Sequence, residues 1–364
     1  MEKHVTEEEI QKELEFIRQR RQQHDSYYEA KASLLINSLK DEFNSQHRLD
    51  KTDKLICTAA GTLAGVIDAV FIGIPHPGRS GVEGGLLDTK VREWFDQHYP
   101  DADMRSLAGQ AISKVPYDAQ DNRNTSIAVD GLSSYFHRLH SLGHDPFLGF
   151  VVGVYDILHG TMTTIGSNGM FAHQQMPGYA DRMATQLLEA FRKQWLHMKS
   201  DVNSPMGLPV PLMSLFETLQ FGHIGEEGLS VAEIVRSMYY QGYDFRHFCA
   251  MSIPTLLVEL IVRIAWAIRS IKAGRSLKQS IPLHTSRERT PKLDTMLCLA
   301  HACFCAVNGV KVFITQNPCA INYPEWLRFS ALLLKEARWR LIDKETARQE
   351  YVTSRILDDN FIIE

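Results

Sequence analysis

One apolar stretch near the start of the chain reads Leu55-Ile-Cys-Thr-Ala-Ala-Gly-Thr-Leu-Ala-Gly-Val-Ile-Asp-Ala-Val-Phe-Ile-Gly-Ile-Pro75. Asp68 is its only charged residue. At about 1.5 Å per residue, a helix of about 20 such residues has the length needed to cross a bilayer. Length alone does not separate a spanning helix from a core helix. The stretch therefore predicts an apolar helix at the centre of the fold.

Other segments repeat this apolar character. Apolar helices are predicted over 133–160, 253–271 and 293–315, and amphipathic helices over 179–198 and 324–340. The first of these is expected to be entered through His144-Asp145-Pro146, with Asp145 as the N-cap. Glycine recurs in the first two apolar segments. Together they predict a mainly α fold, a multi-helix bundle with glycine-rich apolar helices and an irregular insert.

The remaining segments give the expected domain organisation. Residues 1–48 are rich in Glu, Lys, Arg and Gln, with apolar residues at helical intervals, which predicts amphipathic N-terminal helices. Residues 49–340 are predicted to form a helical core. An irregular insert at about 76–131 and a proline-rich connector at about 204–211 would interrupt it, and residues 341–364 would form a C-terminal tail.

Composition sets limits on the class of protein. Of 364 residues, 44% are hydrophobic and 23% charged, a balance typical of globular proteins that bury a core. A net charge of −4 is too small for the whole molecule to bind nucleic acid electrostatically. The six cysteines are spread out, which favours reduced thiols, and no secretory signal is visible. A cytoplasmic location, with possible inner-membrane association, is expected.

The most informative feature is a short pattern that occurs twice. Gly-x-x-x-Gly-Val-x-Asp appears at Gly61, Gly65 and Asp68, and again at Gly149, Gly153 and Asp156. Glycines four apart share one helix face and let another backbone approach closely. Each aspartate would meet that close contact, where a carboxylate needs a partner. Arg263 and Lys311 are the candidate partners, and the two helices are expected to pack together or to occupy equivalent places. A chance match is the open alternative.

A second constellation is rich in histidine. Its candidate metal ligands are His140, His144, Asp145 and His159, with His137 and Asp156 nearby. The adjacent His144-Asp145 pair is similar to the paired His-Asp of metal-dependent phosphohydrolases, in which such residues hold a divalent ion that activates water. The competing interpretation is that these histidines are surface and capping residues.

A basic segment follows the third apolar helix. It carries Arg269, Lys272, Arg275, Lys278, Arg287 and Arg289 against a single acidic residue, Glu288. Such a loop beside an apolar helix is suited to an anionic membrane surface or a nucleic-acid backbone. We therefore expect inner-membrane or nucleic-acid contact through residues 269–292.

The chain resembles a family of uncharacterised bacterial proteins. The resemblance covers most of residues 55–335 and rests on these stretches, in this order: Ala60-Gly-Thr-Leu-Ala-Gly-Val-Ile-Asp68, Gly73, Gly143-His-Asp-Pro-Phe-Leu-Gly149, Gly207-Leu-Pro-Val-Pro-Leu-Met-Ser-Leu215, Ile253-Pro254, Leu293-Asp-Thr-Met-Leu297 and Phe304. No activity is known for that family, so the resemblance implies no catalytic residue and no cofactor. Its members look linked to mobile elements or defence islands, which implies a role in anti-phage defence.

Three functions stay open, because no complete catalytic or nucleotide-binding motif is present. The first is a non-enzymatic helical protein that acts by assembly with partners or by membrane association. The second is a metal-dependent hydrolase of the His-Asp phosphohydrolase type, and the third is a soluble scaffold or sensor. A mean hydropathy of −0.20 weighs against insertion. The expected partners are further copies of the chain or other proteins in a complex, and no cofactor is identified.

Overall fold

The apolar stretch forms α2, Lys51–Ile67, which continues through one π turn, Asp68–Ile72. Asp50 begins the helix as an N-cap, because its carboxylate accepts the Asp53 backbone N–H while the Asp53 side chain accepts from the Asp50 N–H. The computed structural model describes residues 7–78, 81–182, 184–204, 206–225, 227–276, 280 and 290–358.

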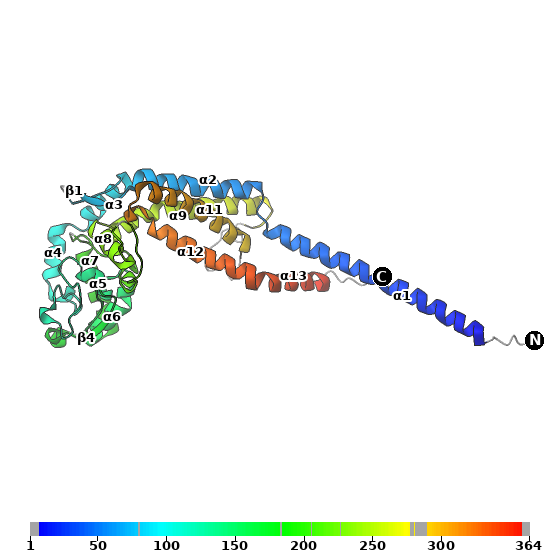
Figure 1. Ribbon diagram of the computed structural model, residues 1–364, viewed down its shortest axis with the longest axis horizontal. Helices are drawn as coiled ribbons and strands as arrows, with labels where there is room; N and C mark the ends of the chain where they lie inside the picture. The colour runs from blue at the N-terminus through cyan, green and yellow to red at the C-terminus, as the bar shows by residue number, and fades with distance from the viewer. Residues whose placement is uncertain are drawn as a thin grey trace, which may run out of the picture.

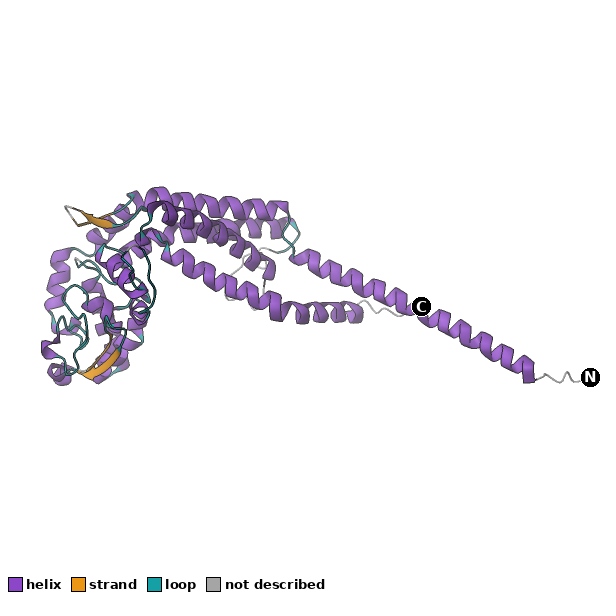
Figure 2. Cartoon of the chain, in the orientation of Figure 1, coloured by secondary structure: helices purple, strands orange, loops and turns teal. Residues whose placement is uncertain are grey.

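Three other long helices complete the bundle: two pack lengthwise on α2, and the third packs on those two (Figure 1). They are α9, Phe245–Lys272, α11, Pro291–Thr315, and α12, Tyr323–Arg338. Their shared core consists of small and medium apolar side chains such as Cys57, Val258 and Met296, all fully buried. The predicted mainly α fold is confirmed, and helices dominate the chain throughout (Figure 2).

The glycines of α2 allow a very close contact with α11. A Cβ atom on Gly61 would lie 2.1 Å from the carbonyl oxygen of Ala300, and one on Gly65 would lie 2.5 Å from the Cβ of Val307. Real Cβ atoms do not approach other atoms this closely, so only glycine fits at these two positions. The α2–α11 crossing is therefore fixed by the first copy of the glycine pattern.

The second part of the molecule, which we call the head, comprises residues 76–244 and lies at one end of the bundle (Figure 1). Its α-helices are α3, Leu86–His98, α4, Asp101–Gly109, α5, His137–His140, α6, Val152–His159, α7, Leu187–Asp201, and α8, Val231–Tyr240. Its strands are β1, His76–Gly78, β2, Gly81–Glu83, β3, Thr161–Ile165, and β4, Phe171–Gln175. They form two antiparallel hairpins, β1–β2 and β3–β4. Short 3₁₀ turns cover Ala111–Ser113, Asn122–Asn124, Leu142–His144, Leu148–Phe150, Pro177–Arg182 and Met213–Thr218 in the head and Pro318–Ala320 before α12.

The predicted apolar helix over 133–160 is wrong. The segment consists of α5, two 3₁₀ turns and α6, and the chain then enters the β3–β4 hairpin. The break lies at Asp145, whose Oδ1 accepts the backbone N–H groups of Phe147 and Leu148 at 2.9 and 2.8 Å. This local bond competes with helical hydrogen bonding, and Pro146 has no N–H to offer.

A buried ionic cluster joins the head to the bundle. Arg92 of α3 donates from Nε to Asp88 at 2.9 Å and from Nη1 to Asp244 at 3.0 Å. Asp88 also lies 2.8 Å from Nδ1 of His247 on α9. Because these charges are buried and mutually paired, they hold α3 against the first turn of α9.

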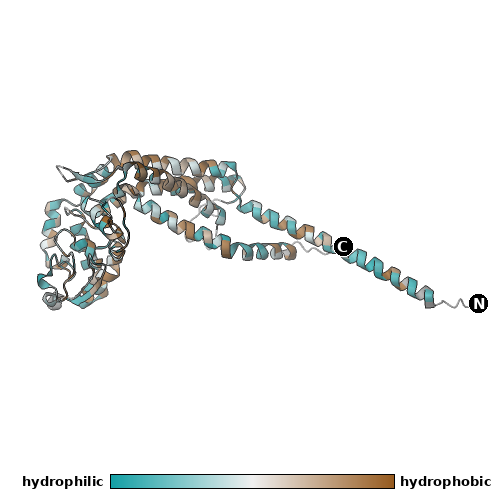
Figure 3. Ribbon diagram, viewed as in Figure 1, coloured by the Kyte–Doolittle hydropathy of each residue, from teal (hydrophilic) through white to brown (hydrophobic). Residues whose placement is uncertain are grey.

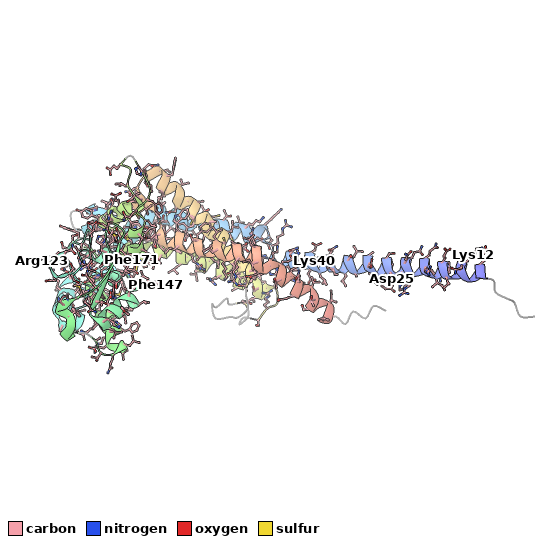
Figure 4. All side chains as sticks on the ribbon, turned by 60° about the horizontal axis from the view of Figure 1, so that its bottom comes forward. Lys12, Asp25, Lys40, Arg123, Phe147 and Phe171 are labelled. Carbon is pink, nitrogen blue, oxygen red and sulfur yellow. The ribbon has the colours of Figure 1, made fainter. Side chains whose placement is uncertain are left out.

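The N-terminal segment forms one long helix, α1, Glu7–His47. Among the described residues, its last turns contact α11 and α13, Lys344–Asp358, and the Phe43 ring lies 5.6 Å from the ring of Tyr351 on α13. At Lys12 and Asp25, α1 extends away from the other drawn helices (Figure 4). A π turn, Trp339–Asp343, connects α12 to α13, so the predicted C-terminal tail is helical up to Asp358.

Candidate metal centre

Four ionisable side chains converge inside the head. Asp118, His144, His197 and Asp201 each offer one ligand atom, and these atoms all lie within 4.8 Å of one another. The Nε2 atoms of His144 and His197 are 3.1 Å apart. Nε2 of His144 lies 3.6 Å from Oδ1 of Asp118 and 3.5 Å from Oδ2 of Asp201. We call these four residues the His/Asp cluster.

Three separate segments bring the cluster together. His197 and Asp201 are four residues apart on α7, so they share one face of that helix. His144 ends the 3₁₀ turn after α5, and Asp118 lies in the irregular segment before Asn122–Asn124. His137 of α5 is adjacent, with its Nε2 atom 3.5 Å from Oδ1 of Asp118.

Backbone carbonyls orient two of the histidine rings. Nδ1 of His197 lies 3.0 Å from the carbonyl oxygen of Ser113, and Nδ1 of His137 lies 3.0 Å from that of Ser134. A carbonyl only accepts, so each Nδ1 carries a proton, and in the neutral form of such a ring the lone pair is on Nε2. This is the tautomer in which histidine binds metal ions in proteins, with the second ring nitrogen donating to a carbonyl or carboxylate.

The protonation states also suit a metal ion. Burial lowers the pKa of His144 to about 4, so its ring is neutral at pH 7. Burial alone would raise the pKa of Asp118, but the neighbouring His137 and His144 hold it well below its usual range. The pKa of Asp201 is also lowered, because His197 and Arg138 outweigh its burial. Two charged carboxylates and the neutral ring of His144 are forms that ligate divalent metals.

A surrounding layer of polar contacts fixes the cluster in place. Arg138 donates from Nε to Oδ2 of Asp201 at 2.9 Å. Gln194 of α7 donates to the carbonyl oxygen of Gly143 at 2.8 Å and accepts from the hydroxyl of Tyr117. The Tyr117 ring packs edge-on against both cluster histidines, at 5.1 and 5.5 Å. These contacts leave the histidines little freedom to turn.

The second copy of the glycine pattern makes room for Gln194, a residue of this layer. A Cβ atom on Gly149 would lie 2.6 Å from Nε2 of Gln194, and one on Gly153 would lie 2.5 Å from Oε1 of the same side chain. Gln194 therefore occupies the space that the two missing side chains leave. Both glycine pairs admit a close neighbour, but the first receives α11 and the second receives a side chain of α7, so the two helices of the pattern do not share a crossing.

A polar groove of about 580 Å³ gives access to the cluster. Asp118 lines it and is the most accessible cluster member, with a side chain 27% exposed against 0% for His144. Arg123, Thr125 and Ser126 line the same groove. Arg123 lies at the outer edge of the head, as Figure 4 shows. The groove can therefore receive a polar substrate whose reacting group reaches Asp118.

Of the predicted metal ligands, only His144 belongs to the cluster. His140 is buried, and its Nδ1 lies 2.8 Å from the carbonyl oxygen of Ile165. Asp145 is occupied by the two backbone N–H groups that it caps. His159 is stacked on Tyr155, with Nδ1 2.8 Å from the Tyr155 carbonyl oxygen. The prediction of these three as ligands is corrected, because their local backbone contacts turn them away from His144.

The two patterned aspartates have different partners. Asp68 is held by Lys311 at 3.1 Å and by the side-chain amides of Asn308 and Asn322 at 2.9 and 2.7 Å. Asp156 instead accepts from three donors of the β3 strand, the hydroxyls of Thr161 and Thr163 and the Thr163 N–H. The hydrogen bonds of Arg263 reach Glu259 at 2.6 Å, one turn back on α9. Of the two proposed cations, Lys311 thus lies at Asp68, while Arg263 forms an ion pair with Glu259.

The described part of the basic segment contains few free cations. Arg269 bonds to Asp50 and Asp53 at the start of α2. Lys272 and Arg275 are exposed at the end of α9. The predicted contacts Lys278, Arg287 and Arg289 lie outside the described residues.

Sequence reasoning missed three of the four cluster members. His197 and Asp201 carried a usable signal, because two ligand-type residues one turn apart on an amphipathic helix face the same way. Asp118 carried none, since it lies in a segment without periodicity and its approach to His144 depends on tertiary structure. No family profile, curated protein or solved structure matches the chain. The site must therefore be interpreted from its geometry.

Proposed function

We propose that this protein is a membrane-anchored, metal-dependent hydrolase, with its metal centre in the head and its anchor in the bundle. The observation that carries the proposal is the convergence of the His/Asp cluster. Its members come from three segments, and they include a neutral His144 ring and two charged carboxylates. Burying such groups without a ligand is costly, whereas a divalent ion compensates their charge. The proposal takes up the second function that the sequence left open, with different ligands.

The donor set suggests the kind of metal and chemistry. Two imidazole nitrogens and two carboxylate oxygens suit zinc and other first-row divalent ions. Bound there, such an ion would lower the pKa of a coordinated water to about 7 and supply hydroxide at neutral pH. His144, His197 and Asp201 would hold the ion and leave one position open for water. Asp118, which lines the groove, would then be placed to accept a proton from that water, while Arg138 holds Asp201 in position.

The groove favours a substrate that bears a phosphoryl group. Arg123 lies at its edge, where its guanidinium is paired with the carboxylate of Asp121, and a phosphate would have to share or replace that partner. The hydroxyls of Thr125 and Ser126 lie along the same wall. Guanidinium and hydroxyl groups are the usual partners of phosphate oxygens. Hydrolysis of a phosphoester at the cluster is therefore the reaction that we propose.

Metal content tests the centre directly. We expect the purified protein to hold about one divalent ion per chain by elemental mass spectrometry, the number that one four-ligand site accommodates. His144→Ala should lower the metal content at least about tenfold, because it removes a ligand from the middle of the cluster. His140→Ala is the matched control, since His140 is an equally buried histidine one turn away and outside the cluster.

Two outcomes would contradict the metal centre. One is a wild-type protein that is folded by circular dichroism and takes up no divalent metal. The other is an equal loss of metal in His144→Ala and His140→Ala, which would mean that any damage to this part of the head removes the ion.

The second element of the proposal is the membrane anchor. Three helical stretches, the first ending at Ile72 and the others formed by α9 and α11, are long and apolar enough to cross a membrane. Their most apolar windows have mean hydropathies of 2.0, 1.8 and 1.8, yet only 39%, 33% and 39% of each window is buried. In Figure 3 the apolar colour gathers along the layer of α2, α9 and α11, while α12 is mixed. A water-soluble bundle would bury that surface.

The distribution of charge in the bundle is the reverse of that in a soluble protein. The outward face of α9 carries five apolar side chains between 39% and 65% exposed: Ile253, Leu256, Leu260, Ile264 and Ile268. Several ionisable groups point inward and are paired, as with Nδ1 of His301, 2.8 Å from Glu325, and with Asp68 and Lys311, whereas Lys335 and Arg338 of α12 are exposed. Charges that face the interior of a bundle and pair there are typical of membrane-embedded helices.

Fractionation with a charge substitution tests the anchor. Wild-type protein should stay in the membrane pellet after a carbonate wash. Leu260→Lys should release a large fraction, because a lysine at the centre of a spanning helix costs about 2.5–3.5 kcal/mol. Leu188→Lys makes the same change at a head residue that is 80% exposed, and should leave the protein in the pellet. Recovery of the wild-type protein in the soluble fraction without detergent would contradict the membrane anchor.

A further inference from the structure

An apolar cavity of about 610 Å³ lies where the head meets the end of α11. Its walls are formed by Met213 and Phe216 of a 3₁₀ turn, by Val235 and Met238 of α8, and by α11 from position 309 onward. The cavity opens to the surface, since Phe313 at its rim is 76% exposed. Its volume is in the range of about 300–1,000 Å³ that is typical of small-molecule sites.

The wall of this cavity is suited to an apolar ligand. The side chains that line most of it offer only C–H groups, so water that enters through the open mouth finds few polar partners. Covering this apolar surface with an apolar ligand is favourable. The cavity therefore calls for an apolar ligand.

The position of the cavity identifies that ligand. Gly309, Val312 and Phe313 of its wall belong to α11, one of the three helices that we propose as the anchor. On the same helix, Val310 and Ile314 are 57% and 73% exposed and belong to the outer apolar surface of the bundle. The mouth of the cavity is thus continuous with the surface that lipid would cover, at the end of α11 where the chain leaves the apolar layer.

We propose that this cavity binds an acyl chain of a membrane phospholipid. A chain can enter from the lipid layer without crossing water, so its transfer costs no exposure of apolar surface. Gln316 and Asn317 follow at the polar end of the wall, where the ester and headgroup of the lipid would lie. This inference rests on the membrane anchor of the proposed function, and it adds a bound lipid to it.

Filling the cavity tests the inference. A Cβ atom on Gly309 would meet no atom within 4 Å, so Gly309→Phe can place its ring in the cavity without a clash in α11. Val310→Phe adds a ring to the neighbouring outward position and is the matched control. We expect native mass spectrometry of detergent-purified protein to show about one phospholipid per chain, the capacity of a single pocket of this size. Retention should fall at least tenfold in Gly309→Phe and stay unchanged in Val310→Phe.

The outcomes separate this inference from the function on which it rests. Protein that resists the carbonate wash but retains no phospholipid, or retains it equally in Gly309→Phe, overturns the lipid site alone. A bound peptide or a second copy of the chain in place of lipid overturns it too. Protein that is recovered in the soluble fraction overturns both the anchor and the lipid site, and its metal content still tests the centre in the head.

Discussion

Asp118→Asn is expected to lower kcat/KM for a simple phosphodiester, bis(4-nitrophenyl) phosphate, by about 100-fold or more, the usual effect of losing a general base. Asparagine keeps the shape of the side chain but removes its charge and its basicity. Asp118 is the cluster member most exposed to the groove, and its Oδ1 lies 3.6 Å from Nε2 of His144 and 3.5 Å from Nε2 of His137. No other side chain of the cluster is placed to receive a proton from a water on the groove side.

The control for this variant is Asp103→Asn, an exposed aspartate on α4 away from the groove, which should retain wild-type turnover. Metal content is measured on the same preparations. Loss of turnover with metal retained would assign Asp118 as the base, and loss of both would assign it as a ligand. Wild-type turnover in Asp118→Asn would contradict any catalytic role for this cluster.

The fold was predictable where the signal is local. Helical periodicity and length gave α2, α9, α11 and α12 to within a few residues at most ends, because long apolar helices need no tertiary information to be recognised. The same reasoning failed over 133–160, where the cap at Asp145 and the proline after it prevent one continuous helix. Hairpin β3–β4 was missed for another reason: its strands are only five residues long.

The site was less predictable than the fold. His144 was found through its neighbour Asp145, which acts as the cap that was also predicted and not as a ligand. The remaining ligands come from positions 118, 197 and 201, and nothing local in the chain says that the irregular segment returns to α7. A buried cluster is a property of tertiary contacts, so a single sequence gives the residue types and not their meeting point.

The glycine pattern shows which structural features a short sequence match predicts and which it does not. In both copies the glycines make room for a close neighbour, which the geometry of a helix face requires. What fills that room differs, α11 in one copy and Gln194 in the other, because tertiary structure decides it. The two aspartates therefore have one sequence context and two energetic roles.

Lys311→Met is expected to destabilise the protein by about 3–5 kcal/mol, the usual cost of leaving one partner of a buried ion pair without its charge. Lys311 is bonded to the carboxylate of Asp68 at 3.1 Å and to the carbonyl oxygen of Gly73 at 3.0 Å, and Asp68 is fully buried. The double variant Asp68→Asn, Lys311→Met should recover part of that loss, because no unpaired charge remains. Thermal unfolding in detergent, analysed as a double-mutant cycle, measures the coupling.

Asp156→Asn provides the comparison within the same pattern. Its donors are threonine groups without charge, so replacing the carboxylate should cost only about 1 kcal/mol, the net worth of one hydrogen bond. The two substitutions thus separate an ion pair inside the bundle from a neutral hydrogen-bond cap in the head. Equal losses in Lys311→Met and Asp156→Asn would mean that the charge of Asp68 is not compensated by Lys311, and the inward-facing charges would then lose their support for a membrane-embedded bundle.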